Sequence, residues 1–199
     1  MDLKYQFNKT SLQQLNRELA MRLEALPTLH AKESALRAEV KRAKDAAQLL
    51  KSRIDKELKS IELMSPLWVE FPALVELEEV KATTRNIAGV KIPQFEGLSF
   101  KMDRFSLFGR PSWLLSGVQI LKGIAEMRVR YLIVSDELNI LEYARKKTTQ
   151  KVNLYEKVQV PAFDEAIQRI KRFLEDEENL AKASQKILKA KKASRVACQ

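Results

Sequence analysis

Apolar residues recur along two long stretches of this chain at the spacing of paired helices. Within each stretch the steps between apolar positions alternate between four and three residues, which places a narrow apolar seam on one side of a helix. Each seam needs an apolar partner, and we expect the two to pack against each other. The seam positions are Leu36, Val40, Ala43, Ala47, Leu50 and Ile54 in the first stretch, and Leu138, Leu141, Val152, Tyr155, Ile167, Ile170 and Leu174 in the second. In the second stretch Arg145 and Thr148 occupy two positions of the same spacing, which stops after Tyr155 and resumes at Phe163.

Residues that typically begin or end helices, such as asparagine, serine and proline, predict the ends of these helices. The first helix begins near Asn8 and runs to about Met64, where Ser65-Pro66 stops it, with a bend and no break at Pro27. The second begins near Pro111-Ser112, is interrupted at Pro161, and continues to about residue 192. At equal rise per residue Leu12 stands opposite residue 166, so the C-terminal helix extends past the start of the first.

Between the helices the apolar period changes to about two, which predicts a β-hairpin. The hairpin turns at Ile87 to Gly89, and Pro93 either confines its second strand to an edge or ends it. The predicted fold is therefore mainly α: a long antiparallel two-helix coiled coil with a small β-hairpin or irregular middle segment. We expect three parts, a helix in residues 1–66, the hairpin segment in 67–112, and a helix with a basic tail in 113–199.

Composition and charge indicate which partners and which compartment suit this protein. Charged residues make up 31% of the chain and the net charge is +10, which permits an acidic partner. Positive and negative charges alternate along both helices, so we expect no nucleic-acid binding. No apolar run reaches the roughly 18 residues that a membrane span needs, so we expect no direct insertion into a bilayer. The lone cysteine, Cys198, indicates a reducing compartment.

Residues suited to catalysis are sparse. The chain has no phosphate-binding glycine loop and no metal-binding histidine pair. His30 is alone in a helical pattern and has no base or nucleophile that the sequence can assign to it. We expect no catalytic, cofactor or metal site, and the function should be mechanical, architectural or one of recognition.

Two further groups of residues have both an ordinary and a functional interpretation. Trp68 and Trp113 flank the middle segment, where capping the helical core is the ordinary interpretation and partner binding the alternative. A basic run follows the last acidic residue, Glu178, and would ordinarily be a solvated helix end. Its members are Lys182, Lys186, Lys189, Lys191, Lys192 and Arg195.

Several short strings, in this order, resemble the D subunit of the V-type and archaeal A-type rotary ATPases, the central-stalk counterpart of the gamma subunit of F-type ATP synthases. They are KTSL at 9–12, NIAGVKIP at 86–93, KVNLYE at 151–156 followed by Val160-Pro161, and IQRIKRFLEDEE at 167–178. The stretch at 26–33 departs from the family's pattern, which indicates a divergent, bacterial branch.

The resemblance implies a non-catalytic rotor shaft on the cytoplasmic, inner face of the cell membrane. Its paired helix ends would stand inside a ring of catalytic and non-catalytic subunits and transmit torque for ATP synthesis or for transport of hydrogen or sodium ions. The middle segment would contact a small companion stalk subunit and a socket subunit on the membrane rotor ring. Implied ring contacts are the basic run 182–195, and implied contacts on the membrane side are Trp68, Ile87, Val90, Ile92 and Trp113.

A coiled-coil adaptor that holds two proteins at a fixed distance is the alternative. An adaptor would account for the apolar seams equally well, and only the family strings favour the shaft over it. Co-purification separates the two, because a shaft brings a nucleotide-hydrolysing hexamer with it and an adaptor brings one or two other proteins.

Overall fold

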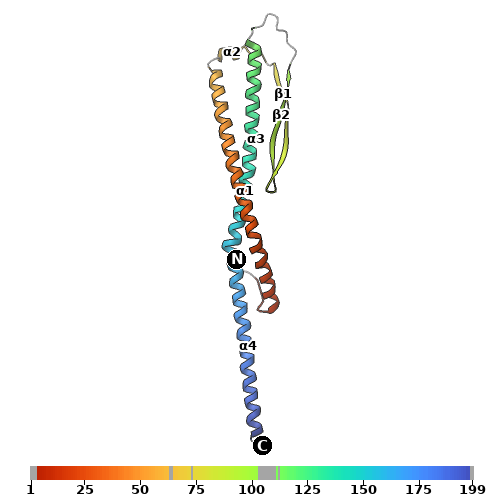
Figure 1. The fold of residues 1–199 in the computed structure, drawn as a ribbon, viewed down its shortest axis with the longest axis vertical. Coiled ribbons are helices and arrows are strands. Elements are labelled where there is room, and N and C mark those ends of the chain that lie inside the picture. Colours follow the sequence, from red (N-terminus) through yellow and green to blue (C-terminus); the bar gives the residue numbers. More distant parts are fainter. Residues whose placement is uncertain (1–3, 63–64, 73, 103–110, 112, 198–199) are drawn as a thin grey trace. The chain divides into compact units, whose positions relative to one another are not determined.

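The computed structural model describes residues 4–62, 65–72, 74–102, 111 and 113–197, and it confirms a mainly α protein with a two-stranded hairpin in the middle (Figure 1). Its elements in chain order are α1 Lys9–Glu62, α2 Ser65–Val69, β1 Val75–Ile87, β2 Val90–Met102, α3 Trp113–Leu154, the π-helical turn η1 Tyr155–Gln159, and α4 Val160–Ala197.

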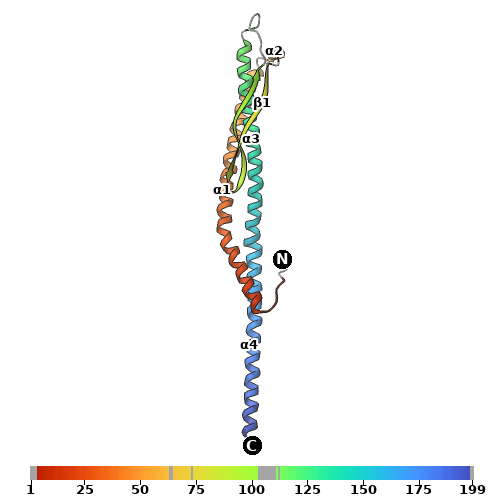
Figure 2. The same ribbon diagram turned by 90° about the vertical axis from the view of Figure 1, so that its right-hand side faces the viewer.

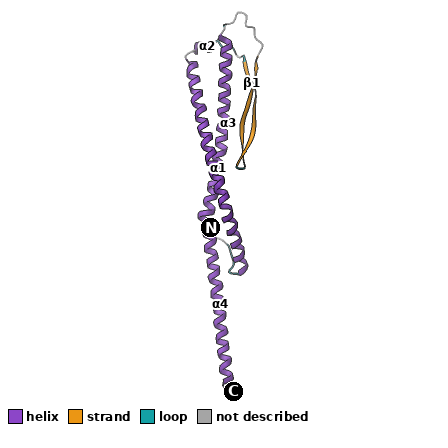
Figure 3. Ribbon diagram, viewed as in Figure 1, coloured by secondary structure: helices purple, strands orange, loops and turns teal. Residues whose placement is uncertain are grey.

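The chain divides into two compact units. The terminal unit comprises residues 1–31 and 148–199, and the central unit comprises residues 32–147. Within each unit a part of α1 runs antiparallel to a helix from the second half of the chain, as the sequence colours of Figure 1 show. Figure 3 marks the same helices and the hairpin by element type. The central unit also contains the hairpin, which lies beside α3 (Figure 2).

Helix α1 begins and continues as its sequence predicts. The Asn8 side chain caps it, because the backbone N–H of Ser11 donates to Asn8 Oδ1 at 2.7 Å. The helix runs through Pro27 without a break. It ends at Glu62, and the short helix α2 starts at Ser65, so Ser65-Pro66 opens a new helix where we expected only a stop. Pro66 is suited to this position, because a helix's second residue needs no backbone N–H. The predicted last residue, Met64, lies outside the described residues.

The hairpin turns where the sequence predicts. Ala88 and Gly89 form a two-residue loop, both with positive φ (50° and 78°), and Ile87 pairs with Val90. Two positive φ angles are the signature of the type I′ turn, whose twist suits a hairpin and which favours glycine. Strand β2 continues past Pro93, which pairs with Thr84, to Met102. Proline is tolerated because both strands of a two-stranded sheet are edges.

Pro161 does not interrupt the second helix, contrary to the sequence prediction. The π-helical turn η1 joins α3 to α4 with helical backbone at both junctions, and the N–H of Val160 donates to the carbonyl of Tyr155. This wide turn lies directly before the proline, whose ring would clash with a carbonyl four residues earlier in a regular α-helix. The helical backbone is therefore continuous from Trp113 to Ala197.

Candidate functional site

The seam of the terminal unit is a core between α1 and α4. Leu15 of α1 is buried with Phe163, Ala166, Ile167 and Ile170 of α4, and Leu12, Leu19 and Leu174 pack around them. Leu12 thus lies against the cluster that contains residue 166, as equal helical rise predicts. No described residue beyond Leu174 on α4 is buried.

The seam of the central unit pairs α1 with α3. Leu36, Val40 and Ala43 form one buried cluster with Leu141, and Leu138 packs against it. Farther along α1, Ile54 is buried, whereas Ala47 and Leu50 are half-buried. On the second helix Val152 is buried and Tyr155 half-buried. Each seam residue that the sequence singles out is therefore at least partly covered.

Arg22 connects α1 to the π-helical turn within the terminal unit. Its Nε donates to Gln159 Oε1 at 2.8 Å, and its guanidinium lies 4.3 Å from the centre of the buried Phe163 ring. Its Nη1 also donates to the Glu18 carbonyl at 2.8 Å. Sequence periodicity did not single out Arg22, because no spacing rule pairs residues so far apart in the chain. This arginine fixes η1 against α1.

The hairpin docks on the helices of its own unit. Ile92 is 2% exposed in the cluster of Leu36, Val40 and Leu141, and Ile87 and Val90 pack against that cluster. Ile87 and Val90 are half-buried, so part of each side chain stays accessible. A two-stranded hairpin is marginal alone and is stabilised here by the helices.

Two cation–π contacts hold the rest of β2 along α3. The Arg130 guanidinium lies 4.8 Å from the centre of the Phe95 ring, and Lys122 Nζ lies 5.7 Å from that of Phe100. Each such contact contributes about 0.5–1 kcal/mol at exposed sites. Strand β1 faces away, and between its first and last residues every side chain is exposed.

Glu137 of α3 is half-buried and interacts electrostatically with the half-buried Glu39 of α1 and the exposed Arg85 of β1. Burial raises the pKa of the Glu137 carboxyl above its ordinary 4.5, the nearby Glu39 raises this pKa further, and Arg85 of β1 lowers it. Arg42 also bonds the Glu39 carboxylate, at 2.7 Å. Arg85 is thus the hairpin's contribution to balancing these acids.

An aromatic cluster covers one end of the central unit. The Phe71 ring lies 5.3 Å from the Trp68 ring and 6.0 Å from the Trp113 ring, between centroids. Both tryptophans are half-buried. A Cβ on Gly117 would come within 2.8 Å of the Phe71 ring, so a larger residue there would displace that ring. The sequence did not predict this contact between Phe71 and Gly117. A glycine inside a helix indicates close packing only once the residue that packs against it is known.

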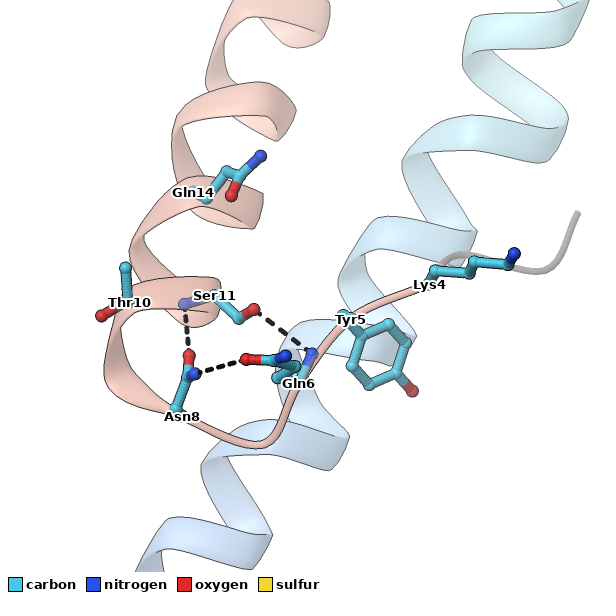
Figure 4. A pocket seen from close by; sticks show the side chains of 7 residues that line it. All are labelled: Lys4, Tyr5, Gln6, Asn8, Thr10, Ser11 and Gln14. Carbon is cyan, nitrogen blue, oxygen red and sulfur yellow. Dashed lines mark hydrogen bonds between the residues drawn. The ribbon is translucent and has the colours of Figure 1, made fainter.

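The start of α1 contains a hollow lined by polar side chains (Figure 4). The backbone N–H of Gln6 donates to Ser11 Oγ at 3.3 Å, and Asn8 Nδ2 donates to Gln6 Oε1 at 3.1 Å. These bonds fold the preceding segment back onto the first turn. The polar groups here therefore serve to cap α1.

The basic run lies on the exposed end of α4. All residues from 175 to 191 are exposed, and Lys182 Nζ lies 4.0 Å from Glu178 Oε2. The side chains of Lys192 and Arg195 lie outside the described residues. Since α1 begins opposite the cluster around Ala166, this part of α4 extends beyond it (Figures 1 and 2).

Groups that could perform chemistry are not gathered in the part of the chain that the structure describes. No three His, Cys, Asp or Glu side chains are grouped there in a way that could hold a metal ion. His30 Nε2 lies 3.9 Å from Glu156 Oε2, and both side chains are about half exposed. Among the described helices, none combines the length and apolar character of a bilayer span.

Comparison with known proteins identifies similar chains along nearly the whole length. The family model for the ATP synthase D subunit matches residues 11–190. The V-type ATP synthase D subunit of Borreliella burgdorferi is 29% identical over 190 residues, covering 94% of each chain. That of Chlamydia pneumoniae is 30% identical over 182 residues, covering 88% of this chain and 87% of the relative.

Proposed function

Because this chain belongs to the family of ATP synthase D subunits, we propose that it is the central rotor shaft of a V/A-type rotary ATPase. It transmits torque between the hexamer that hydrolyses or synthesises ATP and the ion-translocating ring in the membrane. The observation that carries the proposal is the family match over residues 11–190, which includes both buried seams. Two helices joined by an apolar seam resist twisting better than one helix alone.

The distribution of exposed residues supports an orientation. The basic, exposed end of α4, from Lys182 to Arg195, contacts the bore of the ring of catalytic and non-catalytic subunits. The aromatic cluster of Trp68, Phe71 and Trp113 lies toward the companion stalk subunit and the socket of the membrane rotor. The hairpin tip, with Ile87 and Val90 at its surface and Ile92 buried beneath them, lies toward the same partners in this proposal.

The chain itself is a non-catalytic subunit in this proposal. ATP chemistry takes place in the ring subunits, and the ion passes through membrane subunits. The shaft is peripheral, on the cytoplasmic side of the membrane.

Co-purification from the native cells tests the assignment. A tagged copy of the chain, extracted in mild detergent, should bring the catalytic and non-catalytic ring subunits with it, together with ATP hydrolysis. Recovery of one or two other proteins without a hexamer would instead support the coiled-coil adaptor.

Observation of rotation tests torque transmission separately. A bead attached to an added cysteine on exposed β1, for example at Lys81, should rotate when ATP is supplied to a surface-held ring. A bead that stays still on an assembled complex with active ATP hydrolysis would contradict the proposal.

A further inference from the structure

The overhanging part of α4, defined as residues 175–197, carries an apolar stripe. Leu180, Ala183, Ile187 and Ala190 follow one another in steps of three and four, so they lie on one side of the helix. Leu180 is 70% exposed and Ile187 57%, and both alanines are exposed. The core of the terminal unit ends at Leu174. Within the described part of the chain, this stripe is uncovered.

The stripe alternates large and small side chains. Leu180 and Ile187 are seven residues apart. Ala183 and Ala190 are also seven residues apart, and each follows one of the large side chains. When two such helices pair antiparallel, a large side chain of one can fill the space above an alanine of the other. In the matching register Leu180 faces Ala190 of the second helix and Ala183 faces its Ile187. A two-fold axis then generates both contacts twice.

Charge favours the same direction of pairing. Residues 175–178 are all acidic and no acidic residue follows them, whereas Lys182, Lys186, Lys189, Lys192 and Arg195 do. In the antiparallel register residues 175–178 stand opposite residues 192–195 of the second helix. A parallel pair would place acid beside acid and base beside base, which is repulsive.

We propose that the overhanging part of α4 pairs antiparallel with the same segment of a second copy of this chain, giving a two-fold dimer of the free protein. The interface is short, and near the two-fold axis Lys186 of one chain approaches Lys186 of the other, which is repulsive. The dimer is therefore weak and reversible. The inference concerns the free chain and does not depend on the rotor assignment.

Sedimentation velocity of the full chain over a wide concentration range tests the apolar stripe. The wild type should shift from monomer to dimer as concentration rises, and added salt should weaken the dimer. The double variant L180Q/I187Q should lower the association constant at least about a hundredfold, because four buried apolar side chains are lost per dimer. L132Q, which changes a leucine of similar exposure on α3, should leave it unchanged. A wild type that stays monomeric throughout, or an L180Q/I187Q chain that dimerises normally, overturns the proposal.

Exchange of the charges tests whether these charges pair across the interface. E175K/E177K/E178K makes the segment almost wholly basic, and K186E/K189E/K192E makes it mostly acidic. Each variant alone should be monomeric at low salt, and an equimolar mixture should form a heterodimer. Unchanged self-association of both variants, or a mixture that stays monomeric, contradicts pairing through these charges. The direction is tested by the wild type, because a dimer that added salt strengthens would contradict antiparallel pairing. Far-ultraviolet circular dichroism confirms that each variant remains folded.

Discussion

Ile92 lies on a two-stranded hairpin, yet its side chain belongs to the core between α1 and α3. It is the one fully buried residue among the described residues of β1 and β2. A strand pattern shows which side chains share a face, but it does not show whether a helix covers that face. At the scale of single residues, the attachment of the hairpin to the helices therefore depends on the contacts that Ile92 makes in this core.

Substitution of Ile92 by alanine should release the hairpin tip. Loss of a buried isoleucine leaves a cavity and costs about 2–5 kcal/mol. We expect a fall of this size in the free energy of unfolding from urea titration, and faster amide exchange in residues 87–92. Val80→Ala on β1 is the matched control, because Val80 is 40% exposed and should change stability little. Equal effects of the two substitutions would show that the tip does not depend on Ile92.

Glu137 should make stability depend on pH. Its pKa is raised in the folded protein, first by burial and then by Glu39, so the folded state holds the proton more tightly than the unfolded state does. Stability should therefore fall as pH rises from the ordinary carboxyl pKa of 4.5 through the raised value.

Urea titration of Glu137→Gln over this pH range checks the sign. Glutamine removes the charge, so the variant should be more stable than the wild type near neutral pH, and the difference should shrink as the wild-type carboxyl becomes protonated. A variant that is less stable at neutral pH would show that attraction to Arg85 outweighs burial and Glu39.

At the scale of elements, η1 keeps the seam in phase. Tyr155 and Phe163 are eight residues apart, which in a regular helix is roughly 80° beyond two full turns. The wide π-helical turn absorbs one residue, so Phe163 and the residues after it return to the buried side. Arg22 bonds Gln159 at this turn and stacks on Phe163.

Insertion and deletion of one residue in η1 should have unequal effects on stability. One alanine inserted between Val158 and Gln159 adds about 100° of rotation, which should turn Phe163 and Ile170 away from Leu15 and cost more than about 3 kcal/mol. Deletion of Val158 together with Pro161→Ala leaves a seven-residue step that a regular helix accommodates, and stability should stay within about 1 kcal/mol of the wild type. Urea titration distinguishes them, and equal stability of the insertion variant and the wild type would refute this account of η1.

At the scale of the whole molecule, the overhanging part of α4 should add little stability. A chain that ends after Glu178 keeps the whole core of the terminal unit, whose last member is Leu174. Its free energy of unfolding should match that of the full chain within about 0.5 kcal/mol.

Assembly and coupling should nevertheless suffer in the shortened chain. If the basic end contacts the ring, binding to the ring or ATP-driven rotation falls, and K182Q/K186Q/K189Q should weaken binding in the same direction. K44Q/K51Q/K59Q on α1 is a matched control that removes three exposed charges elsewhere. Unaltered assembly and rotation in the shortened chain would remove this segment from the mechanism.

The amino-acid sequence alone determined most of the elements of this protein. Seam spacing predicts the paired helices, the cap-forming residues from Asn8 to Ser11 predict where α1 starts, and Ile87 to Gly89 predict the hairpin turn. These follow from local physics, since helical period, capping and positive φ involve residues close together in the chain. Even so, Pro161 was misjudged, because a proline indicates that a regular helix is disturbed and leaves open whether it breaks or widens.

Only the tertiary structure decided which surfaces remain free. It buried Ile92, brought Arg22 to Gln159, fitted Gly117 against Phe71 and set Arg85 near Glu137. Each of these contacts joins side chains from different elements, so it depends on how the elements pack and leaves no mark in local spacing. The same packing ends the core at Leu174, which is why the stripe beyond it is exposed.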